Sequence, residues 1–455
     1  MKHTVLLYRY VLFLFIYAIT ITPGNAQTEL TLQQSIEIAL RHNPDIRIAE
    51  MDIQKSLHGR TRARSEMFPS VSARGNYDRS WELPEIVFSP PPGFPGANGE
   101  IRARMGVEHT VNSGVTLEQP IYTGGAISAG TRIASHGIEA SEYNFSSVEQ
   151  QTIAEVYDAF YAILLAQELV TVAEQSLSSA EENLRQVERL YEEGATSRFE
   201  LLRAQVQTGT LRPDVTEARH NYELSLENLM NLLGIEEAEG IEANGSFTPR
   251  SRTLHEEDTD RLIEQAYQQR PEFQMLHTQE RMNRENIRIA RSHFLPRVFF
   301  SSSMNWQALR DDLSGLTGDD FTRVTSSQLV VQIPIFNGFA NTARYQEARV
   351  ELQQIQIQKN NARKLIATEI RSLHKNLQQA AEILESQEQV VEQAQEGLRL
   401  ANLLYEEGAA TLLEVIDAQL AYSQASTSYY RAIYNYNTTS VQLERAVGIL
   451  SPESI

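Results

Sequence analysis

The feature that most restricts the fold of this 455-residue chain is an internal duplication, because five short motifs occur twice in the same order. Each motif contains a proline or a glycine with a counterpart in the other half. These pairs are Pro44 and Pro271, Pro69 and Pro296, Pro120 and Pro334, Gly194 and Gly408, and Gly234 and Gly448. The first two pairs are 227 residues apart and the other three 214, so one connection is longer by 13 residues in the first half, where a proline-rich loop covers 89–96. Repetition of this kind predicts one structural unit present twice.

Each half also contains a stretch of 74 residues without proline, which ends at Gly194 or Gly408. A continuous helix of that length would measure about 110 Å at 1.5 Å per residue. Large apolar residues recur every seven positions, a pattern typical of coiled-coil packing. They are Ile163, Val170, Leu177, Leu184 and Tyr191 in the first half, and Leu377, Leu384, Val391, Leu398 and Tyr405 in the second. Glycine then ends each helix and a further helical segment runs back, which predicts a long helical hairpin in each half with its tip at that glycine.

Four other segments alternate between apolar and polar residues, which predicts strands at about 69–84, 103–120, 296–307 and 321–334. Within the first of them, for example, Val71 and Tyr77 share one face while Arg74 and Asn76 share the other. The alternation alone leaves two structures open: the edge of a soluble sandwich, and a membrane β-barrel. With these elements placed, we expect a first repeat at 27–235, a linker or equatorial belt segment at 236–262, and a second repeat at 263–455.

The N-terminus predicts export from the cytoplasm. A short basic region with Lys2 and Arg9 precedes an apolar run at 11–21, and small residues follow at 24–26. This order is typical of a cleaved signal peptide, here residues 1–26. Cleavage would remove two basic residues and change the formal net charge from −19 to −21. Such an excess of acidic residues argues against a nucleic-acid partner, because a phosphate backbone attracts a basic surface.

The body of the chain limits the possible functions further. It contains no cysteine, which excludes disulfides, thiolate catalysis and cysteine-ligated metals. The histidines have no metal-ligand spacing and no nucleophile–base set is visible, so we expect no enzyme activity, no cofactor and no metal. No apolar run in the body reaches the roughly 20 residues of a transmembrane helix. In a bilayer only helices or closed barrels satisfy the backbone, and four strands form a wide barrel only when several copies combine. Export and the prolines beside the strands therefore favour a barrel.

The duplicated layout and three motifs resemble the TolC family of outer-membrane efflux proteins. The motifs are the Asn-Pro-Asp sequence at 43–45, the Pro-Ile-Tyr and Pro-Ile-Phe junctions at 120 and 334, and the Tyr-Glu-Glu-Gly-Ala sequences at 191–195 and 405–409. The resemblance implies a mainly α fold with β, in which a homotrimer forms a twelve-stranded outer-membrane β-barrel continued by a periplasmic α-helical barrel. It implies passive export in the Gram-negative outer membrane, with outer-membrane lipid, a periplasmic adaptor and an inner-membrane pump or ABC-type secretion transporter as partners. The alternative is a secreted periplasmic coiled-coil adaptor or scaffold without a barrel.

A channel needs a gate, and the residues just beyond the second tip are the first candidates. Glu414 and Asp417 are three positions apart, so they share one face of a helix. From the spacing alone, these are either gate residues or two solvated carboxylates. The resemblance favours a gate, because it implies two acidic rings at this motif in a trimer. Carboxylates so close together would attract cations and raise each other's pKa. Glu200 occupies the corresponding position in the first half and is a weaker candidate.

The resemblance implies two further roles near the tips. Tyr405 matches a family tyrosine that holds the closed state, although its heptad position alone also explains it. The family's arginine is replaced by Ala410, and Arg198 is a candidate substitute. The hairpin ends are expected to meet the adaptor, although the glycines also simply end helices. These tip residues are Gly194, Ala195, Thr196, Gly408, Ala409 and Thr411.

Overall fold

A computed structural model of the chain describes residues 28–88, 101–235, 241–251 and 254–452. The predicted signal peptide (1–26) and the proline-rich loop (89–96) lie outside the described residues. The chain divides into two compact units, and each unit draws segments from both sequence repeats. The first unit contains the segment that ends at Glu50, Phe145–Pro271 and the segment from Arg363 onward. The second contains Met51–Asn144 and Glu272–Ala362.

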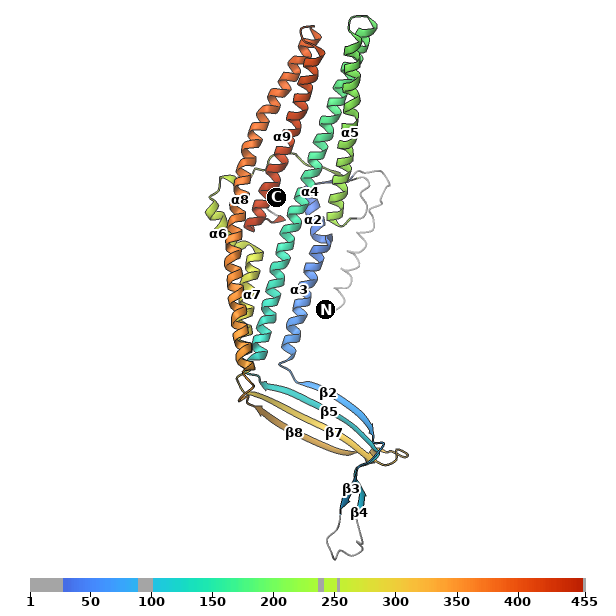
Figure 1. Cartoon of the computed structure of the whole chain (residues 1–455), viewed down its shortest axis with the longest axis vertical. Helices are drawn as coiled ribbons and strands as arrows, with labels where there is room; N and C mark the ends of the chain where they lie inside the picture. Colours follow the sequence, from blue (N-terminus) through green and yellow to red (C-terminus); the bar gives the residue numbers. More distant parts are fainter. Residues whose placement is uncertain (1–27, 89–100, 236–240, 252–253, 453–455) are drawn as a thin grey trace, which may run out of the picture. The chain divides into compact units, whose positions relative to one another are not determined.

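The helices have the same order of lengths in both halves, namely 11, 22, 67 and 36 residues (Figure 1). In the first half these helices are α2 (Leu32–His42), α3 (Pro44–Ser65), α4 (Ala126–Glu192) and α5 (Arg198–Leu233). In the second half they are α6 (Thr259–Gln269), α7 (Pro271–Ser292), α8 (Ala340–Glu406) and α9 (Leu412–Val447). The predicted long helical hairpins are therefore α4–α5 and α8–α9.

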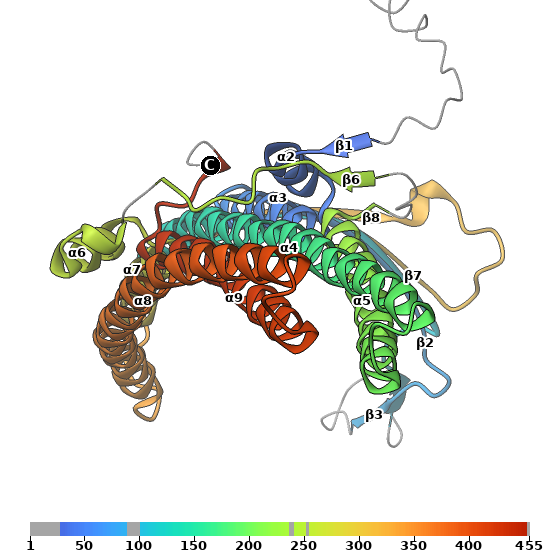
Figure 2. The same ribbon diagram turned by 90° about the horizontal axis from the view of Figure 1, so that it is seen from above.

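The core of the first unit lies where both repeats contribute side chains. Ile36 of α2, Phe160 of α4 and Leu233 of α5 are almost fully buried there, and Val441 of α9 packs into the same cluster. Beside α2, β1 (Thr28–Leu30) pairs in parallel with β6 (Ile241–Ala243) (Figure 2). The predicted linker at 236–262 thus supplies one strand of a two-stranded sheet, and it also contains the short 3₁₀ helix η1 (Leu254–Glu256) and the start of α6.

The ends of α5 and α9 pack against equivalent places in the two repeats. Gly234 closes α5 with a φ of 71°, and a Cβ atom there would lie 2.9 Å from the carbonyl oxygen of His42. Gly448 closes α9 with a φ of 85°, and a Cβ atom there would lie 2.8 Å from the backbone nitrogen of Arg270. Gly234 therefore lies against the residues just before Pro44 in the first repeat, and Gly448 lies against those just before Pro271 in the second.

The second unit contains a four-stranded antiparallel sheet in the order β2-β5-β7-β8. These strands are β2 (Ser70–Arg79), β5 (His109–Tyr122), β7 (Arg297–Arg310) and β8 (Thr322–Gln332). The register places the predicted apolar faces together, since Val71 lies opposite Leu117, Val115 opposite Met304, and Phe300 opposite Leu329. On the other face, polar residues such as Arg74, Asn112 and Asn305 line a shallow cavity. The sheet is therefore amphipathic across all four strands.

The first two predicted strands differ from the structure at their outer ends. The segment predicted at 69–84 stops pairing with β5 at Arg79, and a separate hairpin forms from β3 (Glu85–Phe88) and β4 (Ile101–Arg104). Pro84 lacks the N–H that would continue a sheet ladder. Gly106 has a φ of 101°, which turns the chain between β4 and β5. Gly106 thus divides the segment predicted as one strand at 103–120, and Pro84 lies at the end of the segment predicted at 69–84.

One described helix, α4, is long and apolar enough to cross a membrane by length and composition alone. Core helices of soluble proteins pass the same test, and residues of α4 such as Ile153 and Phe160 are buried in the core of the first unit. The apolar stretch of α4 is thus explained by packing.

Candidate gate and docking tips

The two hairpin tips are built by the same local interactions. Gly194 and Gly408 have φ values of 74° and 70°, the left-handed region that glycine adopts without strain. In the second tip, the N–H of Gly408 donates to Tyr405 O at 3.1 Å and that of Ala409 donates to Leu404 O at 2.7 Å. The first tip repeats this pattern. This is the Schellman arrangement that ends a helix, so the predicted structural role of the glycines is confirmed.

The helices that leave the tips begin with hydroxyl caps. Ser197 Oγ accepts from the N–H of Glu200 at 3.3 Å, and Thr411 Oγ1 accepts from that of Glu414 at 3.4 Å. Only the second cap is reciprocal, because Glu414 Oε2 accepts from the Thr411 N–H at 2.6 Å and from its hydroxyl at 3.0 Å. Thr411 therefore begins α9 through a capping box that fixes the Glu414 side chain.

The hydrogen bonds from Thr411 lower the pKa of the Glu414 carboxyl below its usual range. This direction is opposite to the one that a ring of neighbouring carboxylates would impose. Within one chain, the capping box determines the direction in which the pKa of Glu414 shifts. Repulsion within a ring of carboxylates would act in addition and in the opposite direction. The capping box therefore favours the ionised form of Glu414 and fixes the orientation of its side chain.

Asp417 lies one turn further along α9 and is exposed, as is Glu414. Within the described part of the chain, neither carboxylate forms an ion pair with a basic side chain. The first two turns of α9 therefore carry two uncompensated negative charges on one exposed face. Such a pair attracts cations and repels anions, and it contains no nucleophile or general base arranged for catalysis.

A small apolar core joins the two hairpins near the tips. Val187 of α4, Ala204 of α5 and Leu412 of α9 are at most 5% exposed, and Tyr405 of α8 packs against them. The heptad pattern identifies Tyr405 as a packing residue, and the structure confirms that role. The heptad spacing found in the sequence belongs to the segments of α4 and α8. It therefore did not predict that Ala204 of α5 and Leu412 of α9 lie in this core.

Tyr405 and Glu200, which come from different repeats, lie close together. Burial raises the pKa of Tyr405, and the negative charge of Glu200 raises it further. One carboxylate oxygen of Glu200 forms an ion pair with Arg203 at 3.4 Å, and the other is buried without a hydrogen-bond partner among the described residues. The guanidinium of Arg203 also lies 4.8 Å from the ring centroid of Phe199. The charged partner of Glu200 is therefore Arg203.

Arg198, the candidate substitute for the family arginine, is exposed. It has no hydrogen-bond or ion-pair partner in the described ranges. Ala410 is half-buried, and its N–H donates to Leu404 O at 3.1 Å as part of the tip. The structure thus brings Tyr405 and Glu200 together, whereas no interaction in the described residues links Arg198 to the candidate gate.

Long helical hairpins with capped tips and an amphipathic four-stranded sheet are the parts of an outer-membrane channel subunit. The chain belongs to the outer membrane efflux protein family, whose model matches residues 35–235 and 262–449. It is an efflux or secretion channel of the Gram-negative outer membrane, with a helical tunnel in the periplasm. The family and its relatives are channels rather than enzymes, and they do not support the alternative of an adaptor without a barrel.

Among the similar proteins, protein CyaE of Bordetella pertussis is 24% identical over 437 residues, which cover 95% of this chain and 87% of that protein. Outer membrane protein TolC of Vibrio cholerae is 22% identical over 347 residues, 76% of this chain and 78% of that protein. The crystal structure of the CmeC outer membrane channel of Campylobacter jejuni matches with a TM-score of 0.73 at 17% identity, covering 93% of this chain and 88% of that one. This structural likeness shows the fold.

Proposed function

We propose that three copies of this chain form one passive conduit that receives substrates from an inner-membrane transporter through a periplasmic adaptor. The observation that supports closure of a barrel between copies is the sheet order, in which β2 and β8 are the two edge strands. All neighbouring strands are antiparallel, so β8 of one copy and β2 of the next would also run antiparallel. Pairing of these edges in three copies closes a twelve-stranded barrel and leaves no free edge in the lipid.

We propose that Glu414 and Asp417 form the acidic constriction of this conduit. The support is their position in the first two turns after the tip, their exposure and their lack of ion pairs within the described residues. In a trimer, the six carboxylates would be repeated around one axis and would favour cations over anions. Tyr405 and Glu200, which lie half-buried and close together between the hairpins, would hold the tips together beside this constriction.

The test is neutralisation of both residues, Glu414→Gln with Asp417→Asn, in planar bilayers under a KCl gradient. We expect cation selectivity to fall several-fold, because the charges that concentrate cations are removed. Glutamine at position 414 can still complete the capping box, so the tip is retained. Asp214→Asn with Glu217→Gln is the matched control, since these exposed carboxylates have the same spacing on α5. Unchanged selectivity in the first variant, or an equal loss in the control, would contradict the proposed constriction.

We further propose that the tips dock the periplasmic adaptor through the exposed residues around Gly194 and Gly408. A bulky residue at either glycine is a poor test, because its positive φ would strain any other residue. The neighbouring Ala409 is exposed and is free of that constraint. Since the chain has no cysteine, Ala409→Cys creates a unique crosslinking site.

A cysteine at position 409 is expected to crosslink in cells to a periplasmic adaptor that mass spectrometry can identify. The control is Ala421→Cys, at an exposed alanine of α9 about ten residues from Thr411, which is expected to give no such product. Absence of the adaptor crosslink from Ala409→Cys in a strain with active efflux would count against docking at the tips.

A further inference from the structure

The chain is acidic as a whole, yet the parts of its helices next to the sheet are strongly basic. The helices that lead into the sheet are α3 and α7, and those that leave it are α4 and α8. The eleven residues of each helix nearest the sheet contain nine arginines and one lysine but only two glutamates. The whole chain has a formal net charge of −19, whereas these helix ends are basic. They therefore form a distinct basic level in the second unit, next to the sheet.

At this level a cavity of about 530 Å³ opens between α4, α7 and α8. Its lining includes Arg132 at the start of α4 and Arg288 and Arg291 at the end of α7. Among the residues that the structure describes, no aspartate or glutamate belongs to the lining, and Ser128 contributes a hydroxyl. Three guanidinium groups around a cavity of this size form a setting for an anion larger than a halide.

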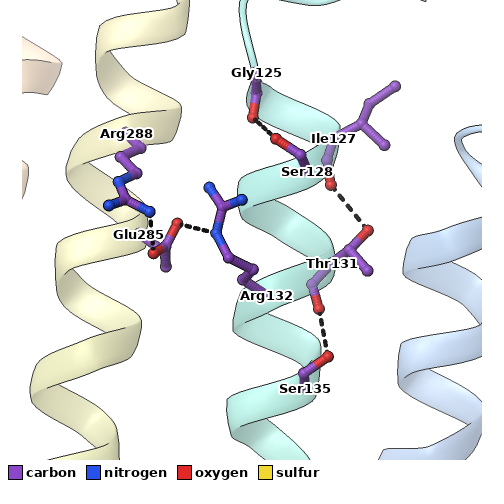
Figure 3. A network of polar contacts seen from close by, with 8 residues as sticks. All are labelled: Gly125, Ile127, Ser128, Thr131, Arg132, Ser135, Glu285 and Arg288. Carbon is purple, nitrogen blue, oxygen red and sulfur yellow. Dashed lines mark hydrogen bonds and ion pairs between the residues drawn. The ribbon is translucent and has the colours of Figure 1, made fainter.

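A buried carboxylate behind the cavity holds two of the three arginines (Figure 3). Glu285 accepts from Arg132 Nε at 2.8 Å and from Arg288 Nη1 at 2.6 Å, and only 9% of its side chain is exposed. One negative charge therefore positions two positive ones and leaves their remaining N–H groups available. Arg291 is exposed and has no ion-pair partner among the described residues. The three arginines and Glu285 together carry a net charge of +2.

The cavity also has an apolar side, because Phe294 and Leu295 belong to its lining and are 47% and 41% exposed. In the same unit, the connection from β8 to α8 presents three very exposed apolar side chains, Ile335, Phe336 and Phe339. Exposed aromatic residues are typical of the level at which a bilayer meets water. A small inorganic anion gains nothing from contact with these apolar groups. A lipid, in contrast, has a charged head for the arginines and acyl chains for the apolar side chains.

We propose that this cavity binds the phosphodiester headgroup of an anionic phospholipid in the periplasmic leaflet of the outer membrane. Arg288 and Arg291 would bind the phosphate oxygens, and the Glu285–Arg132 pair would position Arg288. The first turn of α4, which begins directly after Gly125 at the cavity, adds the positive end of its helix dipole. Phe294 and Leu295 would contact the glycerol and the first carbons of the acyl chains.

The test uses the full chain, solubilised in a neutral detergent, and measures lipid retention by native mass spectrometry. Phosphatidylglycerol is compared with phosphatidylcholine of the same acyl chains. We expect the wild-type chain to retain phosphatidylglycerol preferentially. The variant Arg288→Gln with Arg291→Gln is expected to bind it at least about tenfold more weakly, because two charged hydrogen-bond donors to the phosphate are lost. Arg291→Gln alone, which breaks no ion pair, is expected to show a smaller loss in the same direction.

Arg198→Gln is the matched control, since it removes from a tip in the first unit an exposed arginine that has no ion-pair partner in the described ranges. Excess inorganic phosphate is expected not to displace the bound lipid. Equal retention of the two lipids, unchanged retention in the double variant, or displacement by inorganic phosphate would each overturn the proposal. The test does not depend on the proposed gate, because it measures lipid and not ion flow.

Discussion

Gly448→Ala is expected to destabilise the chain by about 3 kcal/mol or more and to lower its Tm strongly. The φ of 85° at Gly448 costs an alanine roughly 1–2 kcal/mol. In addition, the new Cβ would lie 2.8 Å from the backbone nitrogen and 2.9 Å from the Cα of Arg270. Backbone atoms cannot rotate away as a flexible side chain can, so α9 would have to move from α6. The measurement is thermal unfolding of the detergent-solubilised chain, followed by circular dichroism at 222 nm.

Substitutions at two other glycines distinguish the cost of the positive φ from the cost of the contact with Arg270. Gly408 has a similar φ of 70° but open space around it, so Gly408→Ala is expected to show the backbone strain alone, about 1–2 kcal/mol. Gly209 lies inside α5 with open space and no positive φ, so Gly209→Ala is expected to be neutral or slightly stabilising. A Tm for Gly448→Ala equal to that for Gly408→Ala would show that the contact with Arg270 is unimportant.

Much of the helical architecture could be predicted because proline and glycine mark where the helices begin and end. α3 and α7 begin at Pro44 and Pro271, and Gly194 and Gly408 follow the ends of α4 and α8. These effects are local, since proline fixes φ and glycine tolerates positive φ, and a linear sequence displays them directly. The β3–β4 hairpin was missed because the first predicted strand ends at 84, one residue before β3 begins, although pairing of β2 with β5 already stops at Arg79.

The candidate site was predictable to a different degree at each residue. The sequence places Thr411 and Glu414 three positions apart, and that spacing permits a capping box. Ser197 and Glu200 have the same spacing but form only one of its two hydrogen bonds. In contrast, Tyr405 and Glu200 lie about two hundred positions apart, and only the packing of the two hairpins brings them together. The basic cavity was missed for the same reason: Arg132 and Glu285 are separated by 153 positions. The spacing of apolar residues within one helix does not show which residues of the other repeat it contacts.

Glu280→Gln is expected to weaken the second unit because this carboxylate links two helices there. Glu280 on α7 accepts from Lys359 of α8 at 2.9 Å and from Arg284 at 2.6 Å, with 11% of its side chain exposed. These bonds lower the pKa of Glu280 to about 2, Lys359 contributing most, although partial burial opposes the shift. Glutamine would leave the largely buried ammonium of Lys359 without its counter-charge, which is costly.

The pH dependence gives this expectation its sign. A pKa of about 2 in the folded chain, against about 4.3 for an ordinary glutamate, means that folding favours the ionised form. That contribution, about 3 kcal/mol as an upper value, is complete above pH 5 and is lost as the pH falls toward 2. Wild type and Glu280→Gln should therefore differ most in urea unfolding at pH 7 and converge in acid. Glu396→Gln is the control, because the exposed Glu396–Arg399 pair also lowers a glutamate pKa yet should contribute little to stability. A difference that stayed constant from pH 7 to pH 3 would assign the loss to packing, because the charge on Glu280 is the only part of the interaction that acid removes.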